Sequence, residues 1–170
     1  NENYTYYADR DITIKDFDMN QGDGINVSLW LSGCEHKCPG CYSPHTWDFN
    51  QGELFTPKTI DFIINLLKKD NIHKNLSILG GETLSPNKLG PLLALVTKVK
   101  KEVPNTKIFL WTGYTWDCIY RLNLMKYIDV VVDGRYDKDQ HCPSRYKGSS
   151  NQRVIDVQKS LSEGKIVKYE

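Results

Sequence analysis

The sequence predicts an α/β fold built on a parallel sheet. Short apolar segments rich in β-branched residues alternate with longer segments whose apolar residues recur at helical spacing. Glycine-containing turns follow the apolar segments. Neighbouring parallel strands cannot be joined by a tight turn, so the intervening helices are expected to serve as crossovers.

The length of the chain limits how complete this fold is. The 170 residues are enough for one domain, spanning 1–170. A complete eight-stranded α/β barrel needs about 250 residues. We therefore expect a partial parallel β/α barrel, open along one side, with about four to six strands.

The first half of the chain predicts two strands and one helix. Residues 25–31 are expected to be a strand, and the Cys-, Gly- and Pro-rich residues 32–55 a long loop. Thr56 and Pro57 are typical of a helix N-cap and first helical position, and apolar residues follow at helical spacing. Residues 76–79 predict a short buried strand.

The second half continues the alternation. The predicted elements are helices at 89–99, 115–126 and 157–161, strands at 107–112, 128–133 and 152–156, and a loop at 136–150. Glycine-rich segments follow three of the strands, at 80–82, 113–114 and 133–134. Chemistry on parallel α/β sheets takes place at the carboxyl ends of strands, so we expect these segments and the cysteine loop to form one site.

Composition excludes several classes of function. The net charge is +1 and no basic block occurs, which argues against nucleic-acid binding. No apolar run approaches the roughly 20 residues that cross a bilayer, and residues 1–10 lack the apolar core of a signal peptide. We expect a cytoplasmic protein without membrane contact.

Three of the five cysteines, Cys34, Cys38 and Cys41, lie within eight positions. Such clustering indicates metal binding rather than a disulfide framework. Thiolates are suited to iron–sulfur clusters and to zinc. Three cysteines can hold three irons of a 4Fe-4S cluster and leave the fourth open to a ligand. The alternative is a structural zinc site completed by His36 or His45, in a zinc-stabilised interaction module, although the usual paired spacing of zinc ligands is absent.

The C-x3-C-x2-C spacing followed by Tyr42 resembles the signature of the radical S-adenosylmethionine (SAM) superfamily. The resemblance implies a radical SAM barrel type, with Cys34, Cys38 and Cys41 as ligands of one 4Fe-4S cluster. It also implies that SAM binds the open iron and is cleaved reductively to a 5′-deoxyadenosyl radical. The catalytic radical would come from these cofactors rather than from a side chain.

Further SAM contacts follow from the same resemblance. Gly80, Gly81 and Glu82 are similar to the superfamily's Gly-Gly-Glu motif, in which glycines allow close approach and a carboxylate can pair with the ammonium of SAM. Tyr42 is similar to an aromatic residue near the adenine, with Gly40 and the backbone of Cys41 beside it. Separately from the resemblance, Asp133 and Arg135 follow a predicted strand, and from there they could reach the SAM ribose or a partner.

Over roughly residues 6–158 the chain resembles the activating proteins of anaerobic ribonucleoside-triphosphate reductase. The segments that carry this resemblance are Asp23-Gly24, Ser32-Gly33-Cys34, Cys41-Tyr42, Thr46-Trp47, Trp111-Thr112-Gly113-Tyr114, Val132-Asp133-Gly134 and Gly148-Ser149-Ser150-Asn151-Gln152. It implies that a glycine of the reductase is converted to a glycyl radical, with a flavodoxin or ferredoxin as electron donor. An activase of another glycyl-radical enzyme, such as pyruvate formate-lyase, and a radical SAM enzyme for a small molecule are the alternatives.

Four residues stand apart from the resemblance. Asn26 occupies a position where many relatives carry Arg, and Thr83 replaces a Pro that often follows Gly-Gly-Glu. Cys118 shares a helical face with Leu122 and Met125 if 115–126 is one helix, so we expect it in the core. Cys142 is expected to be a loose thiol rather than a further cluster ligand. The open side of the partial barrel suggests that a segment of a partner protein covers the reacting site.

Overall fold

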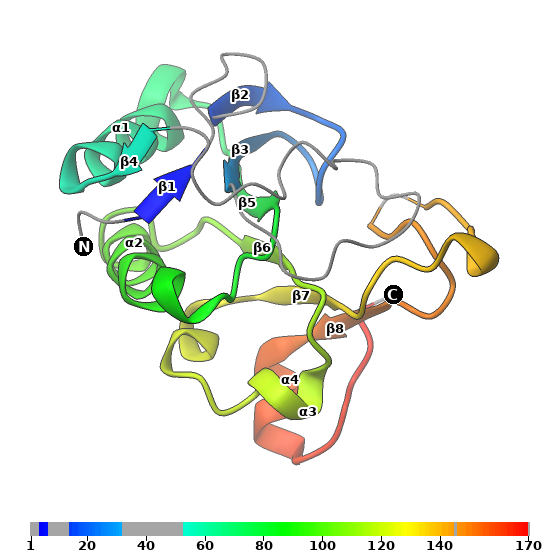
Figure 1. Ribbon diagram of the computed structural model, residues 1–170. Coiled ribbons are helices and arrows are strands. Elements are labelled where there is room, and N and C mark those ends of the chain that lie inside the picture. The colour runs from blue at the N-terminus through cyan, green and yellow to red at the C-terminus, as the bar shows by residue number, and fades with distance from the viewer. Residues whose placement is uncertain (1–3, 7–13, 32–52, 145, 170) are drawn as a thin grey trace.

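A computed structural model of the protein describes residues 4–6, 14–31, 53–144 and 146–169 (Figure 1). Within these residues one mixed sheet contains eight strands. They are β1 (Tyr4–Tyr6), β2 (Ile14–Asp18), β3 (Asn26–Leu31), β4 (Glu53–Phe55), β5 (Asn75–Gly80), β6 (Ile108–Trp111), β7 (Val130–Asp133) and β8 (Arg153–Asp156). The α-helices are α1 (Pro57–Lys68), α2 (Leu89–Glu102), α3 (Trp116–Ile119) and α4 (Val157–Glu163).

The centre of the sheet is parallel, as the sequence predicts. Strands β3, β5, β6 and β7 are hydrogen-bonded neighbours in that order and run in the same direction. Helix α1 lies between β3 and β5 in the chain and α2 between β5 and β6, so both supply crossovers. The predicted strands at 25–31, 76–79 and 107–112 agree with the observed ones to within a residue at each end.

The edges of the sheet are antiparallel, which corrects the expectation of a wholly parallel sheet. Strand β8 runs antiparallel to β7, because the connection between them is a long loop and not a helical crossover. On the other side β1 and β2 each pair antiparallel with β3, and β4 with β1. The pairing path ends at β4 and β8, so the described sheet is open.

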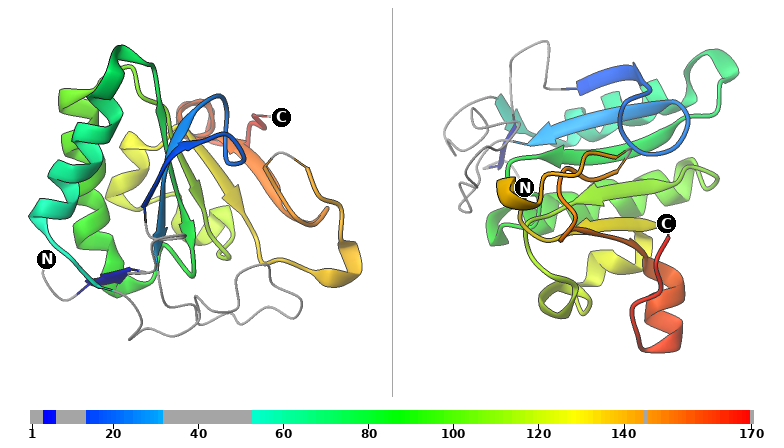
Figure 2. Two further views of the ribbon diagram at one scale, coloured as in Figure 1. Left: turned by 90° about the horizontal axis from the view of Figure 1, so that it is seen from above. Right: turned by 90° about the vertical axis from the view of Figure 1, so that its right-hand side faces the viewer.

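Helices α1 and α2 cover one face of the sheet (Figure 2). Thr56 and Thr59 form a capping box at the start of α1, and Pro57 follows the N-cap as predicted. The large hydrophobic core lies between these helices and the sheet, where Leu29 and Leu95 are fully buried. This layer holds the parallel strands in register, so it also fixes the positions of their carboxyl ends.

The opposite face, here called the loop face, carries a smaller apolar cluster. Phe109, Val130, Val132 and Val154 form it, with Trp111, Tyr146 and Tyr169 packed against them. The connection between β7 and β8 and the last residues of the chain lie over this face (Figure 2). The spacing of apolar residues in the sequence did not predict this layer, because the apolar residues of its loop do not recur at a regular interval.

The helix predicted at 115–126 is wrong in its extent. α3 ends at Ile119, and the 3₁₀ helix η4 (Asn123–Tyr127) follows. Leu122 between them is extended, with φ −64° and ψ 138°. The break removes the continuous face that was expected to bury Cys118, which is exposed.

Candidate active site

The carboxyl end of β5 lies directly against the carboxyl end of β3. The Gly81 amide donates to the Leu31 carbonyl over 2.7 Å. Gly80 has φ +116°, and a Cβ on it would lie 2.4 Å from the Leu31 oxygen. Only glycine meets both conditions, so the Gly-Gly pair allows backbone to approach backbone. Leu31 is also the residue from which the chain enters the cysteine segment.

The predicted cluster ligands Cys34, Cys38 and Cys41, together with Gly40 and Tyr42, lie outside the described residues. Their roles stay predictions. Among the residues that the structure describes, no group of His, Cys, Asp or Glu side chains could hold a metal ion. Cys118 and Cys142 are both exposed free thiols.

Glu82 is almost completely buried, with 1% of its surface exposed. Its carboxylate accepts hydrogen bonds from the Thr112 hydroxyl (2.6 Å), the Gly113 amide (2.8 Å) and the Leu84 amide (2.8 Å). Such charge-assisted bonds are stronger than neutral ones. The carboxylate therefore joins the end of β5 to the residues that follow β6. The predicted pairing of Glu82 with SAM stays a prediction.

The backbone around Glu82 is held by a buried cation. Lys88, which lies in the 3₁₀ helix η3 (Pro86–Lys88), is 3% exposed, and its Nζ donates to the Glu82 carbonyl over 2.5 Å. Thr83 is fully buried and its hydroxyl donates to the Trp111 carbonyl over 2.6 Å. A proline at this position would lack that donor, so Thr83 adds a link between β5 and β6. Sequence reasoning did not find Lys88, since nothing in its local pattern marks it.

Asn26, the other departure from related sequences, has a structural role. Its amide donates to the carbonyls of Asp23 (3.0 Å) and Gly24 (3.3 Å), and its oxygen accepts from the Ser77 hydroxyl (3.0 Å). These bonds join the turn before β3 to the neighbouring strand β5. Asn26 lies at the amino end of β3, away from the predicted site.

Asp133, at the carboxyl end of β7, is 1% exposed and forms a bidentate ion pair with Arg153. Arg153 donates from Nη2 to Oδ2 over 2.6 Å and from Nε to Oδ1 over 3.1 Å. The Trp116 amide also donates to Oδ2, over 2.8 Å. The hydrogen bond to Asp133 raises the pKa of Arg153 above its ordinary value. Asp133 thus fixes the start of α3 against β8.

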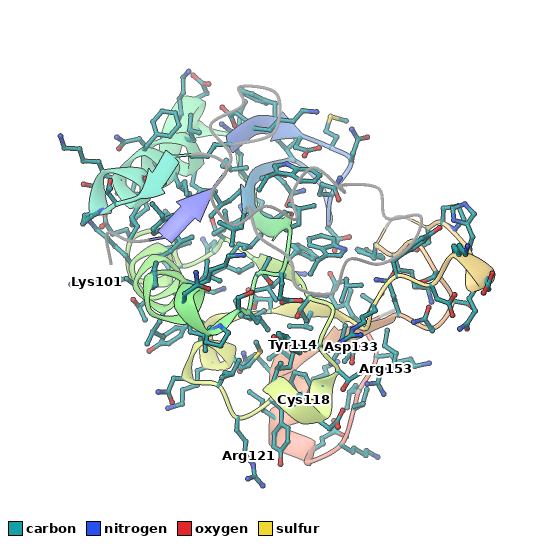
Figure 3. All side chains as sticks on the ribbon, viewed as in Figure 1. Lys101, Tyr114, Cys118, Arg121, Asp133 and Arg153 are labelled. Carbon is teal, nitrogen blue, oxygen red and sulfur yellow. The ribbon has the colours of Figure 1, made fainter. Side chains whose placement is uncertain are left out.

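A cavity of about 650 Å³ lies beside this ion pair. Tyr114, Cys118, Arg135 and Asn151 are among the residues that line it. Figure 3 shows Tyr114 and Cys118 on the α3 side of the ion pair. The cavity is open, and Arg135 is exposed at it. The expectation that Asp133 and Arg135 reach a ligand stays a prediction.

A second cavity, of about 360 Å³, lies on the loop face. Its lining includes Trp30, Gly80, Trp111 and Tyr146. Trp111 Nε1 donates to the Tyr146 carbonyl over 2.5 Å, which holds the loop over the sheet. Because Gly80 belongs to this lining, the cavity reaches the strand end where the Gly-Gly-Glu motif begins.

The protein is similar to a family of iron–sulfur proteins. The family described as "4Fe-4S single cluster domain" matches residues 20–155, which include the three clustered cysteines, the Gly-Gly-Glu turn and Asp133. The family match therefore supports the prediction that the cysteine segment binds an iron–sulfur cluster over the alternative that it binds zinc.

Named relatives give a narrower assignment. The anaerobic ribonucleoside-triphosphate reductase-activating protein of Enterobacteria phage T4 is 39% identical over 137 residues, which cover 81% of this chain and 87% of the relative. The proteins of the same name from Escherichia coli (strain K12) and Vibrio cholerae are 39% and 40% identical over 141 residues, covering 81% of this chain and 92% and 91% of theirs. The chain belongs to the family of anaerobic ribonucleoside-triphosphate reductase-activating proteins, as its sequence motifs predict.

Proposed function

We propose that the protein activates an anaerobic ribonucleotide reductase by radical SAM chemistry. In this proposal Cys34, Cys38 and Cys41 hold one 4Fe-4S cluster. The observation that carries it is the backbone contact between Gly81 and Leu31. That contact brings the Gly-Gly-Glu turn next to Leu31, the last described residue before the cysteine segment in the sequence.

The residues present are suited to these cofactors. Three thiolates supply three corners of a 4Fe-4S cluster, and no competing set of metal ligands occurs among the described residues. When bound, the reduced cluster supplies the electron that cleaves SAM, and the resulting 5′-deoxyadenosyl radical takes a hydrogen atom from a glycine of the partner.

The remaining residues of the proposed site bind SAM or hold the Gly-Gly-Glu turn in position. We assign Gly80, Gly81 and Glu82, with Gly40, Cys41 and Tyr42, as SAM contacts. The Glu82 carboxylate is held by protein donors and its carbonyl by Lys88, so the turn is preorganised before SAM arrives. Preorganisation matters because the reacting carbon must be held within a few tenths of an ångström of its target position.

The overall form of the fold supports a protein substrate. The described sheet is open, which is consistent with the proposed partial barrel and with a partner covering one of its sides. The relatives' names point to the anaerobic ribonucleotide reductase as that partner and favour it over pyruvate formate-lyase. A flavodoxin or ferredoxin is the proposed electron donor. Within the described residues, no helix has the length and apolar character needed to cross a membrane.

The test is anaerobic reconstitution with iron and sulfide, followed by reduction with dithionite and addition of SAM. We expect about four irons per chain and formation of 5′-deoxyadenosine. Cys34→Ala, Cys38→Ala and Cys41→Ala should each abolish deoxyadenosine formation. The matched controls are Cys118→Ala and Cys142→Ala, which remove exposed thiols and should retain it. A zinc-loaded, colourless protein, or equal losses in all five variants, would contradict the proposal.

A further inference from the structure

The segment 148–152 carries part of the sequence resemblance and is not among the proposed SAM contacts. In the structure it closes around the side chain of Gln152. Gln152 Oε1 accepts from the amides of Gly148 (2.9 Å) and Ser149 (3.1 Å), and Nε2 donates to the Gly134 carbonyl over 3.0 Å. The three bonds together need a side-chain amide, because its oxygen accepts while its nitrogen donates. Gln152 therefore ties this segment to the residue that follows β7.

The main chain that follows β7 is held from several sides. The Gly134 amide donates to the Tyr114 carbonyl over 3.0 Å, and Asn151 Nδ2 donates to the Arg135 carbonyl over 2.8 Å. Two successive carbonyls, of Gly134 and Arg135, thus each receive a side-chain amide from segment 148–152. Gly134 also has φ +96°, a conformation that glycine adopts more readily than other residues. Because both residues lie beyond the end of β7, these bonds set the direction of their carbonyls.

This main chain borders the cavity of about 650 Å³, whose lining includes Gly113, Gly134 and Arg135. The cavity adjoins the Gly-Gly-Glu turn, because the Gly113 amide donates to the Glu82 carboxylate over 2.8 Å. Its volume is within the range of small-molecule sites. A ligand that binds at the Gly-Gly-Glu turn and extends along the strand ends would therefore meet the main chain of Gly134 and Arg135 next.

We propose that Gln152 is a positioning residue for SAM. Gln152 itself lines the loop-face cavity, so it acts on the larger cavity through its bond to the Gly134 carbonyl. That bond fixes the main chain from which Arg135 extends at the cavity. The inference rests on the proposed function, because it takes SAM as the ligand. Binding sites tolerate displacements of only about 0.5 Å, so losing this one bond weakens the binding of SAM.

The experiment replaces Gln152 by Glu in the reconstituted protein. The carboxylate still accepts from the Gly148 and Ser149 amides, but it cannot donate to the Gly134 carbonyl and places oxygen against oxygen. SAM affinity is measured by equilibrium dialysis with the cluster oxidised, so that SAM binds without being cleaved, and the unfolding midpoint is recorded without SAM. We expect the affinity to fall by about three- to tenfold, the scale of one hydrogen bond. After reduction with dithionite, KM for SAM should rise by a similar factor while kcat stays within about twofold.

Gln152→Met is the second variant, because the new carboxylate of Gln152→Glu also attracts the cationic sulfonium of SAM. Methionine is similar in length to glutamine, but it is uncharged and has no N–H to donate. Both variants should weaken SAM binding, whereas electrostatic attraction by itself would strengthen binding in Gln152→Glu alone.

Gln158 provides the matched control. Its Nε2 also donates to main-chain carbonyls, those of Met125 (3.0 Å), Lys126 (3.2 Å) and Ile128 (2.8 Å), but these precede β7 and lie at its amino end. Gln158→Glu should lower the unfolding midpoint and leave KM for SAM unchanged, because lower stability reduces the number of folded molecules and not their affinity. Unchanged SAM affinity in Gln152→Met, or a fall in Gln158→Glu as large as that in Gln152→Glu, overturns the inference.

The wild-type protein separates the two proposals. If it binds and cleaves SAM but Gln152→Met binds SAM equally well, the proposed function holds and this inference fails. If the wild-type protein does not cleave SAM, the proposed function itself fails.

Discussion

The hydroxyl of Thr112 donates to the buried carboxylate of Glu82 over 2.6 Å and accepts from the Tyr114 amide over 3.1 Å. One side chain thus joins the Gly-Gly-Glu turn after β5 to the loop after β6, although 30 residues separate the pair. Thr112 therefore helps to hold the Gly-Gly-Glu turn in place.

Thr112→Val keeps the shape of the side chain but removes the donor. It leaves a buried carboxylate oxygen with one partner fewer, so we expect a loss of about 1–3 kcal/mol in the free energy of unfolding and weaker SAM binding. Denaturant unfolding and SAM titration measure the two effects. The control is Thr97→Val, whose hydroxyl bonds only to carbonyls of its own helix and should cost less than about 0.5 kcal/mol. Equal effects in both variants would contradict the account.

Gly80→Ala places a methyl group 2.4 Å from the Leu31 oxygen at φ +116°. We expect it to separate the ends of β3 and β5 at a cost of about 3 kcal/mol or more, since strain and overlap both apply. Gly24→Ala is the control, because Gly24 also has positive φ (+62°) but nothing within 4 Å. That variant should lose only about 1 kcal/mol. Similar stability of the two variants, measured by thermal unfolding, would show that the strand ends are not in contact.

Arg153→Lys removes the planar fork that bonds both oxygens of Asp133. Lysine cannot reproduce a bidentate pair, so we expect a loss of about 1.5–3 kcal/mol and faster hydrogen exchange at the Trp116 amide, which shares the carboxylate. Arg135→Lys, at an exposed residue of the same cavity, serves as the control and should change neither. Unaltered exchange at Trp116 in Arg153→Lys would refute the proposed coupling.

Tyr169, the second-last residue of the sequence, makes the free energy of unfolding depend on pH in the alkaline range. Burial and the hydrogen bond that Tyr169 donates to Asp23 raise its pKa, and Lys107 opposes this. A raised pKa in the folded state means stability that is complete below the unfolded value of about 10 and lost as pH rises through the folded value. Tyr169→Phe should therefore flatten the fall of unfolding free energy above about pH 10 and cost about 0.5–1.5 kcal/mol at pH 7.

Denaturant unfolding of the wild type and of Tyr169→Phe, between neutral and alkaline pH, tests this. A slope that is equally steep in wild type and Tyr169→Phe would remove Tyr169 from the explanation.

The parallel centre of the sheet could be predicted because its signals are local. Strands β3, β5 and β6 are short segments rich in apolar residues and buried along most of their length. Thr56–Pro57 marks a helix start in the sequence itself. Burial on both faces produces such segments in parallel strands. The sequence also predicted that residues 80–82 and 113–114 meet at one edge of the sheet, because the carboxyl ends of neighbouring parallel strands lie at the same edge.

Contacts between distant residues could not be predicted in this way. Asp23 accepts from both Tyr146 and Tyr169, which lie 123 and 146 residues further along the chain. No spacing rule links such residues. The exposure of Cys118 was missed because the break at Leu122 is a backbone event within an otherwise helical pattern. The hydrogen bonds of the Gln152 side chain are likewise visible only once the loop is in place.

The most direct test of the central claim is the electron paramagnetic resonance spectrum of the reductase after anaerobic reaction with the reduced protein and SAM. The account predicts a doublet from a glycyl radical on the reductase, which collapses toward a singlet when the reductase is labelled with α-deuterated glycine. Cys34→Ala should give no signal, and Cys118→Ala should give the full signal. A doublet that persists in Cys34→Ala, or SAM cleavage without any radical on the reductase, would contradict the account.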